Sequence, residues 1–226
     1  MNKIIELNNV QKYYKLGLNK LHVLKNINFS IEQGDFLIIM GKSGSGKTTL
    51  MNILGFLDDF DEGEYIFSKQ NVTKLNENQR SEFRNNYMGF IFQQFHLIES
   101  LTVGQNIELP LLYQNKLSKK QRHELVKDQL ELVGLSNKIN QKPSFLSGGQ
   151  QQRIAISRAL VNNPSIIFAD EPTGALDSGT SRDIMNILEK LNNEGRTIVM
   201  VTHDLDLRPY GNKIISIQDG FLVQEV

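Results

Sequence analysis

The sequence contains no cysteine among its 226 residues, and it carries no excess of either charge. The missing thiols exclude disulfides, thiolate metal sites and cysteine nucleophiles. The 25 basic and 25 acidic side chains balance, which gives no support for a nucleic-acid partner. The longest apolar run spans about five residues, whereas a membrane-spanning helix needs about 20. Because the apolar run at the N-terminus is also too short for a signal peptide, we expect a chain that does not cross a membrane.

The length fits one large α/β domain, or one domain with a smaller subdomain, and neither a repeat nor a low-complexity linker divides the chain. The first part of the sequence is rich in patterns typical of strands. The acidic residues 58–63 lack the ligand spacing of a calcium loop, so a solvated turn is predicted there. Strands are predicted at residues 4–10, 23–31, 36–40, 64–67 and 88–92, with a loop at 15–20 and a polar helix at 78–87.

A phosphate-binding pattern, Gly-x-x-x-x-Gly-Lys-[Ser/Thr], follows the predicted strand at 36–40 and precedes a predicted helix. Its glycines let the backbone curl so that successive N–H groups form an anion cradle, and the helix N-terminus adds partial positive charge. Lys47 can reach the outer phosphates of a nucleotide, and the Thr48 hydroxyl can bind Mg²⁺. A glycine-rich turn that binds nothing is the alternative. The candidate nucleotide-binding residues here are Gly41, Lys42, Ser43, Gly44, Ser45, Gly46, Lys47, Thr48 and Thr49.

The middle of the chain has apolar residues at helical spacing, without an intervening strand. A first helix over 103–113 must kink or end at Pro110. A second helix over 118–133 begins with a capping box and is stopped by Gly134. Within a single domain over residues 1–226, we therefore predict a helical subdomain at 95–162, inserted into an α/β core that comprises residues 1–94 and 163–226.

The segment Leu146-Ser147-Gly148-Gly149-Gln150 opens the next predicted helix, which extends to about Asn162. Ser147 and Gln150 form a second capping-box pattern. The two glycines expose the backbone at the start of the helix, where anions are attracted. An ordinary N-cap without a ligand is the alternative interpretation of the same residues.

Two acidic residues end the apolar strand predicted from residue 166. Asp170 lies where a carboxylate at the C-terminal edge of a parallel strand can hold Mg²⁺ directly or through water. Glu171 then points the other way and can orient or deprotonate a water molecule. The alternative is a pair of solvated acids that only end the strand.

The last part of the chain is predicted to contain one more buried strand at 197–201, followed by His203. A histidine at this edge is predicted to contact a phosphate, although a purely structural histidine is the alternative. The Asp219-Gly220 pair is a strong turn signal. The other elements predicted here are a helix at 178–194 and a closing hairpin with strands at 214–217 and 221–226.

These elements, in this order, resemble the ATP-binding subunit of an ABC transporter over essentially the full length of the chain. The segment at 146–150 matches the signature of that family without a change, and this match is far more specific than the P-loop alone. The resemblance implies an α/β fold: a P-loop NTPase core with a parallel sheet, an N-terminal antiparallel β subdomain and an inserted α-helical subdomain. It also implies an ATPase with ATP and Mg²⁺ as its cofactors.

The resemblance further implies a role for each candidate residue. Tyr14 would stack on adenine, with Tyr13 less suitable by register. Signature residues 146–150 would contact the γ-phosphate of ATP held on a second subunit. The remaining assignments are Lys47 on the phosphates, Gln93 on Mg²⁺ and as a sensor of the membrane partner, Thr48 and Asp170 on Mg²⁺, Glu171 as general base, Asp177 as an acid at the dimer interface, and His203 as the switch histidine.

One P-loop and one signature in the chain imply a second copy in a head-to-tail dimer. The channel is then expected in a separate integral membrane permease, with an adaptor protein as a further candidate partner. Stretches such as 89–97 and 169–177 look like the macrolide-exporter, lipoprotein-release and bacteriocin-export group. The resemblance thus places the protein at the cytoplasmic face of a bacterial membrane, with a docking face near residues 95–98.

Two other classes compete with a transport ATPase. A non-transport ABC ATPase of the cell-division type could signal through a membrane partner without moving a substrate. The repair and translation types are disfavoured, because the chain lacks a long coiled-coil insertion and a second cassette. A P-loop kinase or GTPase would have no use for the signature, and a suitably placed Asn-Lys-x-Asp motif for guanine is missing.

Overall fold

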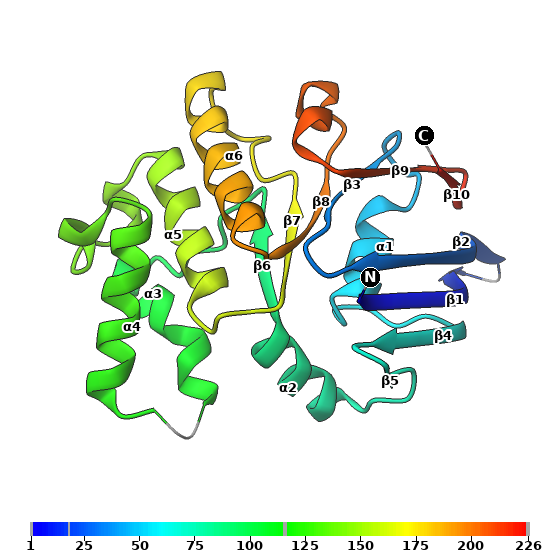
Figure 1. Cartoon of the computed structure of the whole chain (residues 1–226), viewed down its shortest axis with the longest axis horizontal. Coiled ribbons are helices and arrows are strands. Elements are labelled where there is room, and N and C mark those ends of the chain that lie inside the picture. Colours follow the sequence, from blue (N-terminus) through cyan, green and yellow to red (C-terminus); the bar gives the residue numbers. More distant parts are fainter. Residues whose placement is uncertain (1, 18, 115–116, 225–226) are drawn as a thin grey trace. The chain divides into compact units, whose positions relative to one another are not determined.

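The computed structural model describes residues 2–17, 19–114 and 117–224. The chain divides into two compact units, whose elements are labelled in Figure 1. The first unit comprises residues 1–82 and 191–226, and the second comprises residues 83–190. The domain boundaries predicted at 95 and 162 stay a prediction.

An antiparallel sheet forms the N-terminal part of the first unit, with strand order β2-β1-β4-β5 (Figure 1). The predicted strands are present but longer, so the loop predicted at 15–20 is wrong for residues 15, 16, 19 and 20, whereas Gly17 lies in a turn and residue 18 is outside the described residues. Cross-strand pairing continues through Lys15 and Lys20, because main-chain hydrogen bonds extend a hairpin even where its side chains are polar. The strands are β1 (Lys3–Leu16), β2 (Asn19–Glu32), β4 (Glu62–Phe67) and β5 (Gln70–Asn71).

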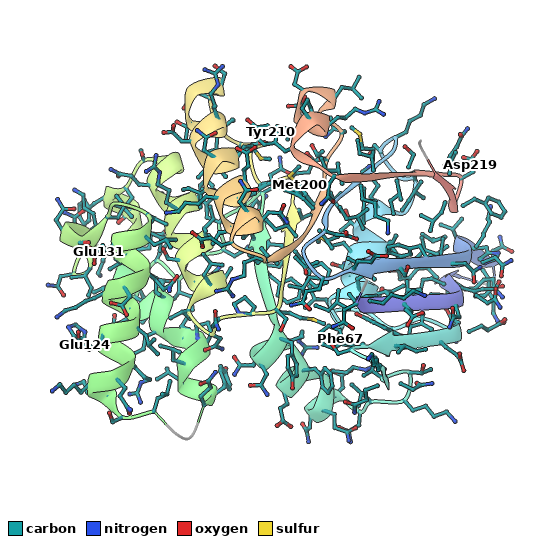
Figure 2. All side chains as sticks on the ribbon, viewed as in Figure 1. Phe67, Glu124, Glu131, Met200, Tyr210 and Asp219 are labelled. Atoms are coloured by element: carbon teal, nitrogen blue, oxygen red, sulfur yellow. The ribbon has the colours of Figure 1, made fainter. Side chains whose placement is uncertain are left out.

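A second group of strands in this unit has the order β10-β9-β3-β8. Every residue of the two parallel strands β3 (Phe36–Met40) and β8 (Thr197–Val201) is buried, which explains their uninterrupted apolar sequences. Figure 2 labels Met200 in β8 and Asp219 in the turn before β10. The closing hairpin is confirmed, although Glu225 and Val226 lie outside the described residues. The other elements are β9 (Lys213–Gln218), β10 (Phe221–Gln224), α1 (Lys47–Leu54), the 3₁₀ helix η4 (Leu205–Tyr210) and α2 (Glu77–Tyr87), of which residues 77–82 belong to this unit.

The second unit contains a parallel pair of strands and most of the helices. The predicted break at Pro110 is confirmed, since the α-helix gives way to a 3₁₀ helix with proline in its first turn. Both predicted capping boxes are also confirmed, at Ser118 and at Ser147. The elements are β6 (Met88–Phe92), α3 (Val103–Glu108), η1 (Leu109–Tyr113), α4 (Lys119–Leu132), η2 (Ser136–Lys138), η3 (Pro143–Phe145), α5 (Gly148–Leu160), β7 (Ile166–Asp170) and α6 (Ser178–Asn193).

Helices α3, α4 and α5 share one apolar core, which includes Ile107, Leu130 and Ile154 (Figure 1). These three residues are fully buried, and each lies on the apolar face of its helix. Across the described ranges, every helix falls short of the length and apolarity that a membrane span requires. The mixed α/β architecture with one antiparallel and one largely parallel sheet is therefore as predicted.

Candidate functional site

The loop between β3 and α1 bends at two positions that accept only glycine. Gly41 and Gly46 have φ angles of 150° and 108°, which side chains rarely adopt. A Cβ atom at position 41 would lie 2.4 Å from the carbonyl oxygen of Ile217, and one at position 46 would lie 2.9 Å from Cδ2 of Leu24. The curled backbone that an anion cradle requires is therefore present in the first unit.

The side chain of Lys47 is folded back over this loop. Its Nζ donates hydrogen bonds of 2.9 Å to the carbonyl oxygens of both Gly41 and Lys42, and the residue is only 9% exposed. Gly46 caps α1, and in the part of the chain that the structure describes this cap has no side-chain hydrogen bond and the first turn has no acidic residue. The Lys47 ammonium and the positive end of α1 therefore lie at the same loop, and no carboxylate in the first turn of the helix neutralises them. This concentration of positive charge suits the binding of a phosphate group.

Two hydroxyl groups in the loop extend this polar lining. Ser45 Oγ is buried and has no hydrogen-bond partner among the described residues. Thr48, the first residue after Lys47, is exposed. A buried hydroxyl without a partner is destabilising unless a ligand or water satisfies it, so the loop is built for a polar ligand and not simply for a tight turn.

His203 lies in the same unit, two residues beyond the end of β8. Ile39 of β3 is in register with Val201 of β8, and the two strands are parallel, so their carboxyl ends share one edge. Thr202 is buried, and its N–H donates to the carbonyl oxygen of Ile39 at 3.2 Å. The exposed His203 therefore lies at the sheet edge where the glycine loop begins.

Tyr14 is held by the acidic turn after α1. Its hydroxyl donates to Asp58 Oδ2, and the Nζ atom of Lys12 lies 4.8 Å from the centre of its ring. Burial raises the pKa of the Tyr14 hydroxyl, the bond to Asp58 raises the pKa further, and a hydrogen bond with Thr49 opposes the shift. The ring is still 37% exposed, whereas the Tyr13 ring stacks on His22 at 4.1 Å. This arrangement favours Tyr14 over Tyr13 as a surface for a base.

The acidic turn is exposed to solvent at Asp59 and Asp61, as predicted, but it also makes contacts that the sequence analysis missed. Lys12 is buried and donates to Asp58 Oδ1 at 2.8 Å and to the carbonyl oxygen of Asp59 at 2.5 Å. The main-chain N–H of Tyr13 donates to Asp61 at 2.7 Å, and Arg80 forms an ion pair with Asp59. A buried ammonium needs a nearby carboxylate, so the turn serves as the anionic partner of β1.

The second unit contains the acids predicted at a strand end. Phe92 of β6 is in register with Asp170 of β7, so Gln93 and Glu171 are the next residues along two parallel neighbours. Glu171 has a φ angle of 46°, an unfavourable value for glutamate that is typical of functional sites. A Cβ atom at Gly174 would lie 2.9 Å from Nε2 of Gln93. The edge of this strand pair therefore presents an amide and two carboxylates together.

Helix α5 begins at the predicted signature segment. Ser147 Oγ accepts from Gln150 N at 3.3 Å, and Gln150 Oε1 accepts from Ser147 N at 3.1 Å. The first turn contains no acidic residue, so the partial positive charge of the helix end is not offset there. Leu146, which precedes the cap, is buried. The predicted cap is real, and it leaves the Gly148 end of the helix suited to an anion.

Asp177 starts helix α6 in the same unit. It accepts hydrogen bonds from the backbone N–H of Thr180 at 3.0 Å and from the Thr180 hydroxyl at 2.6 Å. These bonds hold the pKa of Asp177 below its usual value. The structure thus gives Asp177 a capping role, and its predicted place at a dimer interface stays a prediction.

The starts of α5 and α6 meet where a Cβ atom at Gly149 would lie 2.3 Å from Cγ2 of Thr180. Replacing Gly149 with Ala should therefore lower the free energy of unfolding by about 1–3 kcal/mol, because either the Thr180 side chain must rotate away from its hydrogen bond with Asp177 or one of the helix ends must shift. Adding Thr180→Ser should restore most of the loss, since serine lacks Cγ2 but keeps the hydroxyl that Asp177 accepts. Thermal unfolding of the variants measures both effects.

The neighbouring glycine is the matched control for that substitution. A Cβ atom at Gly148 would lie 3.6 Å from both Leu176 and Phe95, which is ordinary contact, so Gly148→Ala should be neutral or slightly stabilising. Equal melting temperatures for the two alanine variants would show that α5 and α6 do not touch at Gly149.

Three further residues of the second unit were missed by the sequence analysis. Gln152 donates to the carbonyl oxygens of Phe92 and Pro172. Arg158 donates to the carbonyl oxygens of Phe95 and His96, and burial lowers the pKa of its guanidinium. The third missed residue is Gly174, where any larger side chain would collide with the Gln93 amide. No local pattern identifies such contacts, since their partners lie far away in the sequence.

The donor groups also fit magnesium as the metal. Among the described residues there is no group of three or more His, Cys, Asp or Glu side chains that could hold a metal ion. Mg²⁺ does not require one, because it is usually bound by one or two protein groups together with phosphate oxygens and waters. Within the second unit, the Gln93 amide and the Asp170 carboxylate offer oxygen atoms of the kind that Mg²⁺ prefers, and within the first unit the exposed Thr48 hydroxyl offers another.

A parallel strand that leads into a glycine loop of this form, with the lysine at the start of a helix, defines a P-loop nucleotide-binding protein. A family model described as ABC transporter matches residues 24–174. The uncharacterized ABC transporter ATP-binding protein MJ1508 of Methanocaldococcus jannaschii is 51% identical over 221 residues, which cover 98% of each chain. The chain therefore belongs to the ABC transporter family, as an ATP-binding subunit with ATPase chemistry.

Two further relatives bear on how this subunit works. The macrolide export ATP-binding/permease protein MacB of Aggregatibacter actinomycetemcomitans is 48% identical over 98% of this chain, which spans only 34% of MacB. The ATP-binding cassette MJ0796, also from Methanocaldococcus jannaschii, was solved as a dimer in a post-hydrolysis state bound to ADP and Pi. It superimposes with a TM-score of 0.90 at 45% identity, over 98% of this chain and 97% of that one. The predicted cassette fold is thereby confirmed.

Proposed function

We propose that this ATPase powers export through a separate integral membrane permease. The observation that carries the proposal is the 48% identity with the ATP-binding part of MacB over 98% of the chain. A permease on a separate polypeptide is part of this proposal, and the match with the ATP-binding protein MJ1508, which covers 98% of both chains, supports it. Macrolides are the cargo class that the name of MacB gives, and we propose antimicrobial peptides and lipoprotein-like molecules as further candidate cargo classes.

In the proposed reaction, Glu171 accepts a proton from the attacking water while the water oxygen bonds to the γ-phosphorus of ATP. The bond from that phosphorus to the bridging oxygen breaks, which releases ADP and phosphate. Lys47 neutralises charge on the transferred group, and His203 contacts the same phosphate. Bound Mg²⁺, held by Thr48, Gln93 and Asp170, would supply charge neutralisation between the outer phosphates.

We further propose that two copies act as a head-to-tail dimer, with each ATP held by the glycine loop of one copy and by residues 146–150 of the other. The dimer of MJ0796 and the start of α5, whose first turn contains no acidic residue to offset its partial positive charge, support this arrangement. Tyr14 would carry the adenine on its exposed ring face, since base–aromatic stacking contributes about 1–3 kcal/mol. Hydrolysis would then weaken the dimer and reset the permease.

The dimer would act at the cytoplasmic face of the membrane, where the permease holds it. We propose that the permease docks near Phe95 and Ile98. Ile98 is 45% exposed, and the preceding carbonyl groups of Phe95 and His96 are held by Arg158, so the docking segment is anchored on α5. An adaptor protein remains a further candidate partner. The second candidate function is an ABC ATPase that signals through a membrane protein without transport.

Purification of the chain at native expression levels from detergent-solubilised membranes tests this proposal. We expect a permease with several spanning helices to copurify and to raise the ATPase rate when reconstituted with the chain. The Ile98→Ser variant serves as the control for specific docking, and it should recover less permease at an unchanged melting temperature, because Ile98 is exposed. Copurification of division proteins alone would favour the signalling function and overturn export.

A further inference from the structure

The buried side chain of Gln152 links three segments that the proposed function uses. It lies on α5, two residues beyond the signature segment, and is fully buried. Its Nε2 donates to the carbonyl oxygen of Phe92 at 3.3 Å and to that of Pro172 at 2.6 Å. Phe92 directly precedes Gln93, and Pro172 directly follows Glu171. One amide therefore holds the peptide units next to both residues.

The oxygen of the Gln152 amide shows that glutamine at this position has an energetic cost. Its Oε1 atom is buried and lacks a hydrogen-bond partner in the part of the chain that the structure describes. An apolar side chain of similar shape would avoid this unfavourable desolvation. The presence of glutamine is therefore best explained by its two N–H donors, since only they reach the carbonyl groups beside Gln93 and Glu171.

A second side chain of α5 forms hydrogen bonds with the segment that follows Gln93. Arg158 donates to the carbonyl oxygen of Phe95 at 2.9 Å and to that of His96 at 2.6 Å. The segment that carries Gln93 is thus held to α5 on both sides. Glu171 needs comparable support, because its φ angle of 46° persists only where surrounding contacts hold the backbone.

We propose that Gln152 is a positioning residue for ATP hydrolysis. Its amide fixes Gln93 and Glu171 relative to the start of α5, where the signature residues lie. This inference rests on the roles proposed above for Gln93 and Glu171. The inference goes beyond those roles because it links ATP turnover in one subunit to the position of α5 in that same subunit. The buried amide of Gln152 provides this link.

The Gln152→Met variant tests the inference, since methionine has a similar length and no hydrogen-bond donor. We expect its kcat to fall by about tenfold or more, because small displacements of catalytic groups cost up to about 100-fold in rate. Its affinity for a fluorescent ATP analogue should change by less than about twofold, because the glycine loop is untouched. Thermal unfolding checks that the variant is folded.

Ser157→Ala is the matched control on the same helix. The Ser157 hydroxyl is also buried and donates to a carbonyl group, that of Gln129 at 3.1 Å, but this contact is with α4. The control should keep the normal kcat. An equal loss of kcat in both variants would mean that Gln152 acts only through general stability of α5, which would overturn the inference.

Two further measurements keep the test decisive if methionine disturbs folding. Gln152→Glu retains the shape of the side chain but offers at most one donor for two carbonyl groups, so its kcat should also fall. In a double-mutant cycle with Gln93→Ala, the losses in kcat should be clearly less than additive, since both act on the same segment. Additive losses, or a folded Gln152→Glu variant with normal kcat, would contradict the positioning role.

The proposed function and the inference can fail separately in these measurements. If Glu171→Gln in the otherwise unchanged chain keeps its turnover, the assignment of Glu171 fails, and the inference loses its basis. If Glu171→Gln stops turnover while Gln152→Met hydrolyses ATP at the normal rate, the function stands and only the role of Gln152 is overturned.

Discussion

Replacing Glu171 with Gln is expected to lower kcat by about 10²–10⁴-fold, the usual contribution of a general base. Glutamine fills the same space but cannot accept the proton of the attacking water. The unusual backbone conformation of Glu171 and the bond that Gln152 makes to the next carbonyl group direct the side chain equally in the variant. ATP should therefore still bind, and phosphate release under saturating ATP measures the loss.

The same variant should accumulate as a dimer in the presence of ATP, because hydrolysis is the step proposed to separate the copies. Size-exclusion chromatography with and without ATP makes this visible. Glu189→Gln is the matched control, since Glu189 is exposed on α6 and has no proposed role. If the Glu171 variant turns over ATP at a rate close to that of the control, Glu171 is not the base.

Replacing Lys47 with Ala should weaken nucleotide binding by about 10–100-fold, which corresponds to the loss of about 1.5–3 kcal/mol from charged hydrogen bonds. Lys47 already donates hydrogen bonds to the carbonyl oxygens of Gly41 and Lys42. Binding of a phosphate group would replace these hydrogen bonds, so the net gain in binding free energy is smaller than the strength of the new contacts. Its ammonium is nevertheless the positive charge held inside the loop. Titration with a fluorescent ATP analogue measures the affinity.

Loss of the loop contacts could also loosen the unliganded protein, so thermal unfolding has to accompany the titration. Lys74→Ala removes a lysine from an exposed position of the same unit and serves as the control for charge alone. An unchanged affinity in a folded Lys47→Ala variant would remove the basis for the phosphate-binding role of the glycine loop.

Features set by neighbouring residues were predictable from the sequence. The capping boxes at Ser118 and Ser147 each involve residues only three positions apart, and Pro110 acts on its own helix through its ring. The glycine loop is similar, because its bends depend on the φ angles of single residues. Such patterns are local, and they therefore also located the candidate P-loop and signature residues.

Contacts between distant parts of the chain were not predictable in this way. Asp58 meets Lys12 across 46 residues, and Gln152 meets Phe92 across 60. The acidic turn becomes the counter-ion of the buried Lys12 only when β1 packs against it. The extension of β1 and β2 into the loop predicted at 15–20 has a related cause, since pairing between main chains leaves little trace in side-chain patterns.

The network around Tyr14 makes the effect of one substitution in this region depend on the neighbouring residues. The hydroxyl of Tyr14, the ammonium of Lys12 and the carboxylate of Asp58 satisfy one another. Loss of Asp58 alone would strand a buried charge, whereas joint replacement of Lys12 and Asp58 by apolar residues would not. The three side chains therefore depend on one another for their stability, and the ring proposed to carry the base is held in place by Lys12 and Asp58 together.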